Sequence, residues 1–395
     1  MLQNLYELFT PVQLATLSLL LFLFVAELIY LLFFYNRVSL FAGRAAAGKV
    51  EYAQQLPSVS VVVYAHAEEA ASVVDLLPLL MSQNYPHYEV IVVNDGAAFE
   101  VQNAISVYEC EYDNLYQTFI PERVYNVSRK KLGITIGIKA AKNDVIVVTE
   151  AHCKPMGKEW LQSIARNFTP GVDVVLGYTR MSQQGAKRGM GFTVYDRVVF
   201  ALRYLACAVM RRPFMGMSGN IAYRREAFFA NKGFSSTLNL HHGDDDLLIN
   251  DIANRKNTRI ELSPESVVES IYDNNKQAWE EMRMRYGFTS KYMHHSPRAW
   301  FALENVLHYL FWAMVALVVI LSPANLISLI AAAVMAVSYW VLAVVVYHRA
   351  CRTLGERFML LLVPLFQLVR PFYTLCIGLQ SRIYNRSNFT WQYLR

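Results

Sequence analysis

The residues of this chain that could most directly do chemistry are three adjacent carboxylates, Asp244, Asp245 and Asp246. Like charges a few ångströms apart repel, so each raises the pKa of its neighbours and makes them better proton acceptors near neutral pH. The cluster also follows Gly243 and precedes an apolar run. That pattern is typical of a solvated helix N-terminus, where Asp caps free N–H groups and complements the helix dipole. The cluster alone leaves both interpretations open.

Acidic and imidazole side chains also gather at three other places, each directly after a predicted strand. In chain order they are Ala65-His66-Ala67-Glu68-Glu69, Asn94-Asp95-Gly96 and Thr149-Glu150-Ala151-His152-Cys153. Because ligands of an open α/β sheet bind at the carboxyl ends of its strands, we expect these three groups on one rim. Together with the Asp cluster, they predict a site for a cation-bearing ligand.

Short β-branched runs alternate with helical patterns between about residues 55 and 295, and this alternation must position those side chains. The expected strands are 59–64, 90–93, 145–148 and 172–176, and the expected helices are 68–81, 133–141 and 160–168. Unbroken runs of valine and isoleucine are typical of strands buried on both faces of a parallel sheet. The pattern therefore predicts an α/β fold, with a Rossmann-like open sheet that is mostly parallel.

The two ends of the chain are far more apolar than its middle. The whole sequence is 54% hydrophobic and 17% charged, which is too apolar for an ordinary soluble enzyme and too polar in its middle for a pure membrane bundle. Residues 12–35 are long enough to cross a hydrocarbon layer of about 30 Å as a helix. The competing interpretation is a cleaved signal peptide. The length of the run, its lack of a basic start and its lack of a small-residue cleavage site disfavour that interpretation.

Further apolar segments follow towards the C-terminus. Residues 300–321 and 324–347 predict a membrane hairpin, since a Ser-Pro pair breaks the helical pattern between them. A last segment, residues 358–379, carries Arg370 near its middle, and a charge at mid-bilayer is costly. We therefore expect this segment to lie in the interface or to pack inside the protein.

Basic residues beside the apolar segments predict the orientation of the chain. Those that follow the first segment and the hairpin are Arg37, Arg44, Lys49, Arg349, Arg352 and Arg357. They place the middle of the chain on the cytoplasmic side. The expected division is a transmembrane anchor and basic linker at 1–50, a cytoplasmic domain at 51–298 and a membrane region at 299–395. The net charge of +6 then reflects topology and contact with anionic lipid, and we expect no nucleic acid partner.

Several segments resemble the inverting family 2 glycosyltransferases, most of all membrane-anchored bacterial members, with cellulose and hyaluronan synthases as more distant relatives. The segments are SVSVVVYAHAEE, LLMSQNYPHYEVIVVNDGA, KKLGITIGIKAAKNDVIVVTEAHCKP, GNIAYRREAFFANKGF and GDDDLLIN. The resemblance covers about residues 12 to 350. It implies a GT-A fold, a nucleotide-sugar donor, a divalent cation on the donor diphosphate and a carboxylate base that deprotonates an acceptor hydroxyl.

Carried over residue by residue, the resemblance also implies roles for single side chains. The catalytic residues are Asp245, as the base, with Asp244 and Arg285; the donor-binding residues are His66, Glu68, Asp95 and Glu150; the metal ligands are Glu150 and His152; and Asp246 and Tyr286 lie on the acceptor side. A positioned general base typically contributes 10²–10⁴-fold to a rate. A metal ion and a fixed guanidinium stabilise the charge that gathers on a leaving diphosphate.

This chain departs from the family pattern at several positions. Asn94 replaces an Asp, Ala67 an Asn, Glu150-Ala151-His152 an Asp-x-Asp, Met282 a Gln and Tyr286 a Trp. Because Mn²⁺ accepts nitrogen more readily than Mg²⁺, the imidazole of His152 predicts a preference for Mn²⁺. Three simpler interpretations stay open. His152 could support neighbouring residues or cap a helix without ligating a metal, and Tyr286 could serve simple aromatic packing. Residues 129–131 are more typical of a solvated basic face than of phosphate ligands.

The sequence thus predicts a multi-pass enzyme of the bacterial inner membrane that transfers a sugar from a nucleotide-sugar donor to a lipid-linked or cell-surface glycan acceptor. The alternative is a catalytically impaired relative that binds a nucleotide sugar or glycan, or that serves as the partner subunit of an active synthase. A partner glycosyltransferase or an oligomer is compatible with either hypothesis. A polytopic transporter is disfavoured, because the predicted cytoplasmic domain is too large and the spans are too few.

Overall fold

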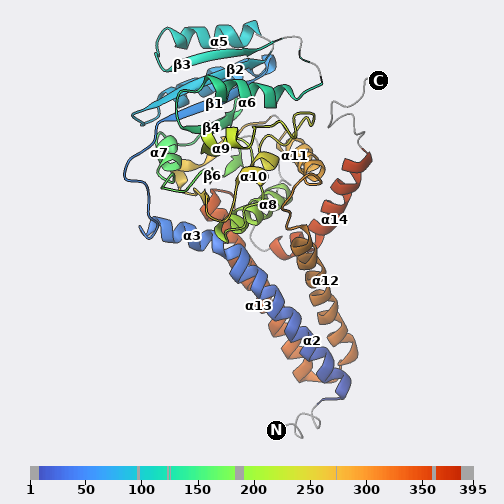
Figure 1. The fold of residues 1–395 in the computed structure, drawn as a ribbon. Helices are drawn as coiled ribbons and strands as arrows, with labels where there is room; N and C mark the ends of the chain where they lie inside the picture. Colours follow the sequence, from blue (N-terminus) through green and yellow to red (C-terminus); the bar gives the residue numbers. More distant parts are fainter. Residues whose placement is uncertain are drawn as a thin grey trace.

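The computed structural model describes residues 9–95, 98–121, 124, 126–182, 191–272, 274–357 and 362–383. Gly96 of the predicted Asn94-Asp95-Gly96 group, the side chain of Ala67 and the start of the predicted segment 358–379 lie outside the described residues. Figure 1 shows an α/β body at one end of the molecule and a stalk of long helices at the other.

A seven-stranded sheet in the order β3-β2-β1-β4-β8-β6-β9 forms the centre of the α/β body. Its strands are β1 (Val59–Ala65), β2 (Tyr88–Asp95), β3 (Leu115–Ile120), β4 (Val145–Glu150), β6 (Val174–Leu176), β8 (Ile221–Arg224) and β9 (Thr258–Ile260). Only β8 runs antiparallel to its neighbours; the pairs β3-β2, β2-β1, β1-β4 and β6-β9 are parallel. The predicted mostly parallel sheet is confirmed, and all four strands predicted from the sequence are present.

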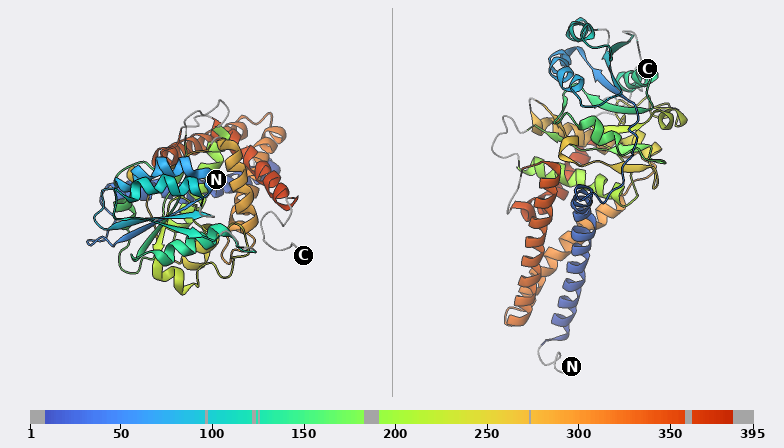
Figure 2. Two further views of the ribbon diagram at one scale, coloured as in Figure 1. Left: turned by 90° about the horizontal axis from the view of Figure 1, so that it is seen from above. Right: turned by 90° about the vertical axis from the view of Figure 1, so that its left-hand side faces the viewer.

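Helices cover both faces of this sheet (Figure 2). The helices of the first part of the body are α4 (Ala70–Met81), α5 (Phe99–Glu109), α6 (Arg129–Ala140) and α7 (Trp160–Ala165). In β1, Val61 and Val63 pack in the core formed with α4, α5 and α7, whereas Val62 and Tyr64 pack in the core formed with α6. Alternate side chains of one buried strand thus enter two cores, which explains its unbroken apolar run.

Helix α6 lies unusually close to the sheet because it contains glycine at two contact points. A Cβ atom on Gly133 would lie 2.8 Å from Ile120 Cδ1, and one on Gly137 would lie 2.6 Å from Val62 Cγ1. Ser128 caps the helix by accepting a hydrogen bond from the backbone N–H of Lys131. The helix therefore begins at Arg129, before the predicted start at residue 133, and its first turn lies over the carboxyl ends of the strands.

A small second sheet and further helices complete the body. The sheet contains, in this order, β5 (Cys153–Pro155), β10 (Val268–Ser270) and β7 (Thr179–Met181). The further helices are α8 (Gly191–Val209), α9 (Arg225–Ala230), α10 (Asp246–Ile252) and α11 (Asn275–Thr289). Two 3₁₀ turns, η2 (Ala67–Glu69) and η3 (Pro264–Ser266), complete the set. The loop that ends in the Asp cluster leads into α10, so the cluster does stand at a helix N-terminus.

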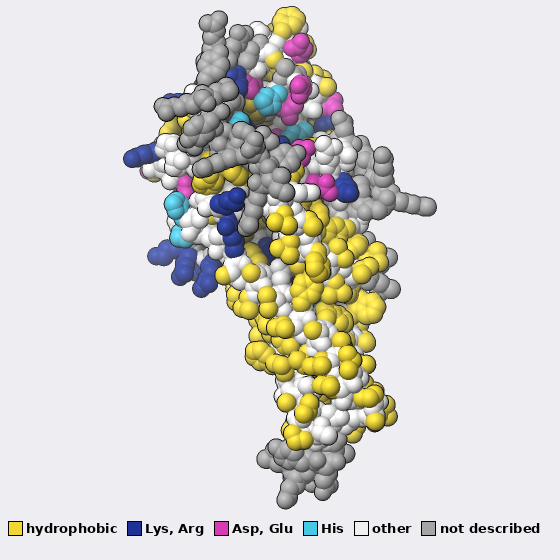
Figure 3. All heavy atoms as spheres, turned by 90° about the vertical axis from the view of Figure 1, so that its right-hand side faces the viewer, with side chains coloured by type: hydrophobic (Ala, Val, Ile, Leu, Met, Phe, Trp, Pro, Cys, Tyr) yellow, Lys and Arg dark blue, Asp and Glu magenta, His cyan; other side chains and the backbone are white. Residues whose placement is uncertain are grey.

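Within the described residues, three helices are long and apolar enough to cross a membrane: Pro11–Ala46, Arg298–Leu321 and Leu326–Leu354. The first is assembled from α2 (Pro11–Leu28), the π-helical turn η1 (Ile29–Tyr35) and α3 (Asn36–Ala46), and the other two are α12 and α13. In Figure 1, α2, α12 and α13 form the stalk, and α3 lies beside the body. Figure 3 shows hydrophobic side chains along the stalk, with Lys and Arg side chains beside its junction with the body. The predicted anchor and hairpin are thus present as candidate spans.

The last described helix, α14 (Val363–Ile383), is not among these candidate spans of the described chain. It packs against α8, α11 and α13. Arg370 is buried, and its Nε donates to Asp196 Oδ1 at 2.7 Å. The same carboxylate accepts from Trp279 of α11 and pairs with Arg283. The charge that made a simple span unfavourable is therefore neutralised by packing α14 on the body.

Candidate active site

A cavity of about 490 Å³ lies at the carboxyl ends of β1 and β4. Most of the predicted site residues line it: His66, Glu150, His152, Asp244, Asp245, Asp246, Arg285 and Tyr286. The strand ends, the Asp cluster and α11 meet around one space, as expected for ligands at the carboxyl edge of an α/β sheet. Glu68 and Asp95, although described, are not part of the cavity lining.

Asp245 is held in the cavity wall by uncharged donors. The residue is 8% exposed. Its Oδ2 accepts hydrogen bonds from the backbone N–H of Ser218 at 2.8 Å and from the Tyr286 hydroxyl at 2.6 Å. Its Oδ1 accepts from the backbone N–H of Asp246 at 2.7 Å, which makes Asp245 the N-cap of α10. Asp245 therefore both caps α10 and lines the cavity.

Burial raises the pKa of Asp245, and the charge of Asp244 raises it further, to about 6. The sequence argument named the like charge, which is the smaller of these two causes. Lys130 and the hydrogen bond from Tyr286 act in the opposite direction. A carboxylate with such a pKa is ionised at pH 7 and is more basic than an exposed aspartate.

Asp246 ties α10 to α11. The residue is fully buried, and its Oδ1 accepts from the backbone N–H of Leu247 at 2.8 Å. The Thr289 hydroxyl of α11 donates to its other oxygen. Burial, followed by the charge of Asp245, raises the pKa of Asp246. Through these contacts Asp246 connects the N-terminus of α10 to α11.

Tyr286 combines aromatic packing with a polar contact. Its ring stacks on Phe200 with centroids 5.1 Å apart and an interplanar angle of 27°, while its hydroxyl donates to Asp245. Burial, followed by the charge of Asp245, raises the pKa of this phenol well above its ordinary value, so the hydroxyl keeps its proton. The packing interpretation is correct for the ring and incomplete for the hydroxyl.

Lys130 links the two halves of the cavity. Its Nζ lies 2.5 Å from Glu150 Oε1 and 2.8 Å from Asp244 Oδ2. Burial would lower the pKa of this ammonium, but the carboxylates of Asp244 and Glu150 raise it, so the group stays charged. The lysine therefore neutralises one acid from the end of β4 and one from the loop before α10.

The interpretation of residues 129–131 as a solvated basic face is wrong. Arg129 Nε donates to Asp95 Oδ1 at 2.7 Å, and Lys131 is buried with its Nζ donating to the backbone oxygen of Thr237 at 2.7 Å. The physical reason is that α6 begins earlier than predicted, so these residues form its first turn above the strand ends. Positive charges oppose the dipole at a helix N-terminus, and carboxylates from distant segments compensate them here.

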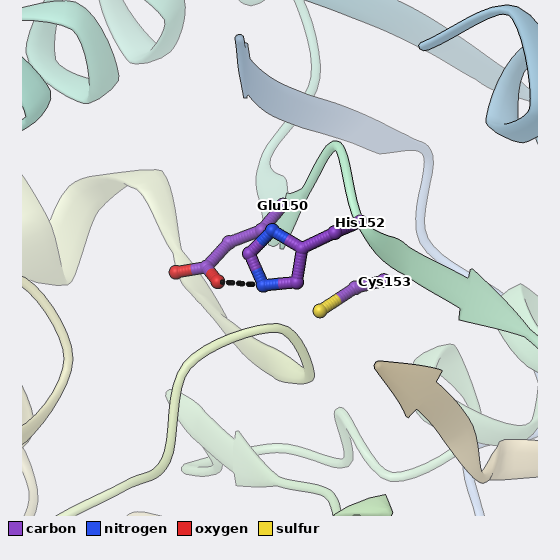
Figure 4. Close-up of side chains that lie close together, drawn as sticks. All are labelled: Glu150, His152 and Cys153. Atoms are coloured by element: carbon purple, nitrogen blue, oxygen red, sulfur yellow. Dashed lines mark ion pairs between the residues drawn. The ribbon is translucent and has the colours of Figure 1, made fainter. Parts of the chain in front are cut away.

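Glu150 and His152 lie in contact, as the predicted metal ligands should. His152 Nε2 is 2.9 Å from Glu150 Oε2 and 2.8 Å from the Tyr272 hydroxyl, and His152 Nδ1 is 3.2 Å from Glu69 Oε1. The ligand atoms of Glu150, His152 and Cys153 all lie within 4.8 Å of one another. Figure 4 shows the imidazole turned toward the Glu150 carboxylate, with the Cys153 thiol on its other side. The imidazole lines the cavity and contacts Glu69, Glu150 and Tyr272.

The charges of these two residues reinforce each other. Burial would raise the pKa of Glu150, but Lys130 and His152 hold it well below its usual range. Burial would lower the pKa of His152, but Cys153 and the carboxylates of Glu150 and Glu69 raise it well above 6.5. Ionisation of the Glu150 carboxylate and protonation of the His152 imidazole therefore favour each other.

Comparison with known families identifies the chain. Residues 23–392 match the family described as Glycosyl transferase family 21. The chain belongs to this family. The expected glycosyltransferase is thereby confirmed, and whereas the sequence was compared with family 2 members, the family model that matches is that of family 21. No curated protein gives a match.

Three solved structures are similar to this family 21 chain. The mannosyltransferase PcManGT from Pyrobaculum calidifontis, in complex with GDP-Man and Mn²⁺, shares 17% identity over 91% of this chain and 99% of that chain, with a TM-score of 0.53. Two others have lower TM-scores. GalNAc-T7 with UDP, GalNAc and Mn²⁺ has a TM-score of 0.41 and 15% identity, over 56% of this chain and 45% of that chain. S. aureus TarS has a TM-score of 0.40 and 14% identity, over 86% of this chain and 93% of that chain. At these identities the first comparison establishes a shared GT-A-like fold.

Two predicted donor-binding residues of the family 21 chain take unexpected positions. Glu68 is exposed in the η2 turn, and the neighbouring Glu69 lines the cavity instead. Asp95 lies one layer behind the cavity, where Tyr64, His66 and Arg129 bind it. Burial would raise the pKa of Asp95, but these partners hold it far below its usual value.

Asn94 shows why one family acid is replaced here. It is fully buried; its Nδ2 donates to Ala98 O at 2.9 Å, and its Oδ1 accepts from Ala98 N at 2.9 Å. An ionised aspartate could accept but could not donate. The amide therefore closes the loop after β2 with both of its polar groups.

Sequence reasoning missed Glu69, Lys130, Tyr272 and Ser218 as site residues. A signal existed for Glu69, because it stands three residues after His66 and its carboxylate accepts from the His66 backbone N–H at 3.0 Å in the η2 turn. Ser218 contributes a backbone N–H, which no side-chain pattern reveals. Arg285, by contrast, was predicted and lines the cavity rim with a side chain 47% exposed, 3.7 Å from Glu281.

Proposed function

We propose that this protein is a membrane-bound, inverting glycosyltransferase that moves a sugar from a nucleotide-sugar donor to a lipid-linked or cell-surface glycan acceptor. The observation that carries the proposal is the Asp245 carboxylate. It lies in the wall of a cavity at the strand ends, and the Tyr286 hydroxyl and the Ser218 backbone N–H orient it. Family 21 membership supports the reaction class.

In the proposed reaction, Asp245 takes the proton from the acceptor hydroxyl as that oxygen attacks the anomeric carbon. A bond forms between the acceptor oxygen and this carbon, the bond to the donor phosphate breaks, and its electron pair leaves with the diphosphate. Arg285, on the cavity rim, has the planar donor set that suits phosphate oxygens. Holding the reactants in line accounts for much of the rate in such a displacement.

The residues present fit a divalent cation at Glu150 and His152. One offers carboxylate oxygen and the other imidazole nitrogen, 2.9 Å apart; a cation bound there would take the place of the imidazole proton, because a ligating histidine is neutral. Glu69 contacts Nδ1 of the imidazole and so directs Nε2 toward Glu150, which is how carboxylates commonly orient metal-binding histidines. A cation there would supply positive charge to the donor diphosphate, and the mixed donor set favours Mn²⁺ over Mg²⁺. PcManGT is known in complex with GDP-Man and Mn²⁺.

The three candidate spans support a membrane location. We assign residues 1–50 to the anchor and its linker, 51–298 to a cytoplasmic catalytic domain and 299–395 to a membrane region. The basic residues beside the spans favour a cytoplasmic face, and a bacterial inner membrane fits this arrangement. With the stalk in the membrane, the catalytic body would lie next to the membrane surface, where a lipid-linked acceptor would be available.

A catalytically impaired relative is the second candidate function. The observation that favours it is the set of ion pairs at the altered metal motif, where Lys130 and His152 both contact the Glu150 carboxylate. Such a protein would bind a nucleotide sugar or glycan, or would serve as the partner subunit of an active synthase.

A donor panel separates the two functions. The purified full-length protein in detergent is incubated with a series of nucleotide sugars and a lipid extract, with Mn²⁺, with Mg²⁺ and with a chelator. The proposal expects turnover of at least one donor, fastest with Mn²⁺. No turnover with any donor, together with measurable nucleotide binding, would assign the protein to the second function. Equal rates in Mg²⁺ or in chelator would contradict the metal assignment.

A further inference from the structure

The first turn of α6 supplies a lysine to the site that the family-based roles do not use. Ser128 caps the helix, and Gly133 and Gly137 let it lie close to β1, β2 and β3. The helix therefore carries Lys130 to the carboxyl edge of the sheet. Its Nζ reaches two carboxylates, Glu150 at 2.5 Å and Asp244 at 2.8 Å.

The neighbouring cations of this turn have other partners. Arg129 binds Asp95 behind the cavity, and Lys131 donates to the backbone of Thr237. Among the described residues that line the cavity, the Lys and Arg side chains are Lys130 and Arg285. Lys130 is 26% exposed, and Arg285 stands on the rim with 47% exposure. Lys130 is thus the deeper of the two cations that an entering anion would meet.

The cavity carries an excess of acids that a diphosphate would have to approach. Glu69, Glu150, Asp244 and Asp245 all line it. A nucleotide diphosphate is itself an anion, so among these acids its binding is favoured where cations lie close to its phosphate oxygens. A lysine that already touches two of these acids is placed for such contact, because its ammonium has three donors.

We propose that Lys130 binds the diphosphate of the nucleotide-sugar donor and stays with the leaving diphosphate during transfer. This inference rests on the proposed function and adds a phosphate-binding residue to it. On donor binding, the Nζ exchanges at least one of its carboxylate partners for a phosphate oxygen. The lysine remains protonated throughout, because the acceptor proton goes to Asp245 and the electron pair of the broken bond goes to the phosphate.

The test compares binding of nucleoside diphosphates with binding of the corresponding nucleosides. UDP, GDP, uridine and guanosine are titrated calorimetrically into the full-length protein in detergent with Mn²⁺. The variants are K130M, which removes the charge, and K130R, which keeps it. The matched control is K139M, which removes an exposed lysine from the same helix. Thermal unfolding of each variant verifies that it is folded.

The inference expects K130M to weaken binding of the preferred diphosphate by at least about tenfold, the size of a charge-assisted hydrogen bond. Nucleoside binding should stay unchanged, K130R should retain most of the affinity, and K139M should match the wild type. Undiminished diphosphate binding by K130M would overturn the inference. Equal losses for nucleoside and diphosphate would also overturn it, because they would mean that the lysine only shapes the cavity. A wild-type protein that binds neither diphosphate and turns over no donor of the nucleotide-sugar panel would overturn the proposed function itself.

Discussion

The two halves of the cavity hold carboxylates in opposite ways. On the α10 side, Asp245 is buried and accepts from an amide and a phenol, and its pKa rises to about 6. On the β4 side, Glu150 lies between Lys130 and His152, and its pKa is held well below the usual range. Uncharged donors orient a base without removing its affinity for a proton, whereas cations fix an acid as a permanent anion. One cavity thus holds a carboxylate that keeps its affinity for a proton and another that stays an anion, the difference on which the proposed roles of base and metal ligand rest.

The largest expected effect comes from removing the proton acceptor. D245N should lower kcat by about 10²–10⁴-fold, the usual contribution of a general base, because the amide cannot take the acceptor proton. The measurement is donor turnover at saturating substrate. The control is D251N, an acid on the same helix that does not line the cavity, and it should keep wild-type turnover. A D245N rate within a factor of about three of the wild type would contradict the role of Asp245 as the proton acceptor.

A smaller effect is expected from restoring the family acid on the β4 side. H152D replaces nitrogen with oxygen at the proposed metal site, and Mg²⁺ prefers oxygen. The ratio of the rates in Mn²⁺ and Mg²⁺ should fall by about tenfold, within the range seen when metal surroundings change. The measurement is initial rate against the concentration of each metal. An unchanged ratio would show that His152 does not touch the cation.

Removing the Tyr286 hydroxyl tests whether its hydrogen bond sets the pKa of Asp245. Its hydrogen bond lowers the pKa of Asp245, so Y286F should raise that pKa by roughly one unit. A base acts when ionised, so the acid limb of the rate profile should move to higher pH. Turnover should then fall about twofold at pH 7 and more at pH 6. The measurement is kcat from pH 5 to 9. A uniform loss at every pH would mean that the hydroxyl does not act through the base.

The smallest effect on rate is expected behind the cavity. N94D restores the family acid but removes the donor to Ala98 O in a fully buried position. An unsatisfied buried acceptor costs about 1–3 kcal/mol, so the unfolding temperature should fall while kcat changes little. The measurement is thermal unfolding beside turnover. A faster enzyme of unchanged stability would mean that an acid at this position serves the donor.

The sequence predicted those parts of the fold that rest on continuous apolar runs. The strands β1, β2 and β4 and the three candidate spans all show such runs. The edge strand β3 was not predicted, because polar and exposed residues lie in its middle. Helix α8 was not predicted either. It buries charged residues, among them Asp196 and Arg197, whose ion-pair partners lie far along the chain.

The site was predictable where chemistry depends on residue type and unpredictable where it depends on long-range pairing. The Asp cluster was found from its residue types, and Glu150 from its type and its place after a strand. Lys130 was not, because a basic first turn is unfavourable in isolation and becomes favourable only beside Glu150 and Asp244. Family patterns give no information about such compensation, because this chain departs from them on that side of the cavity.

The account depends most directly on Asp245 as a base with a raised pKa, and the pH dependence of kcat/KM for the wild-type protein tests it. Acceptor deprotonation requires the ionised carboxylate, so the account predicts an acid limb with an apparent pKa of about 6. Above that limb the rate should reach a plateau. A rate that stays constant from pH 7 down to about pH 4.5, near the ordinary range of an aspartate, would contradict it.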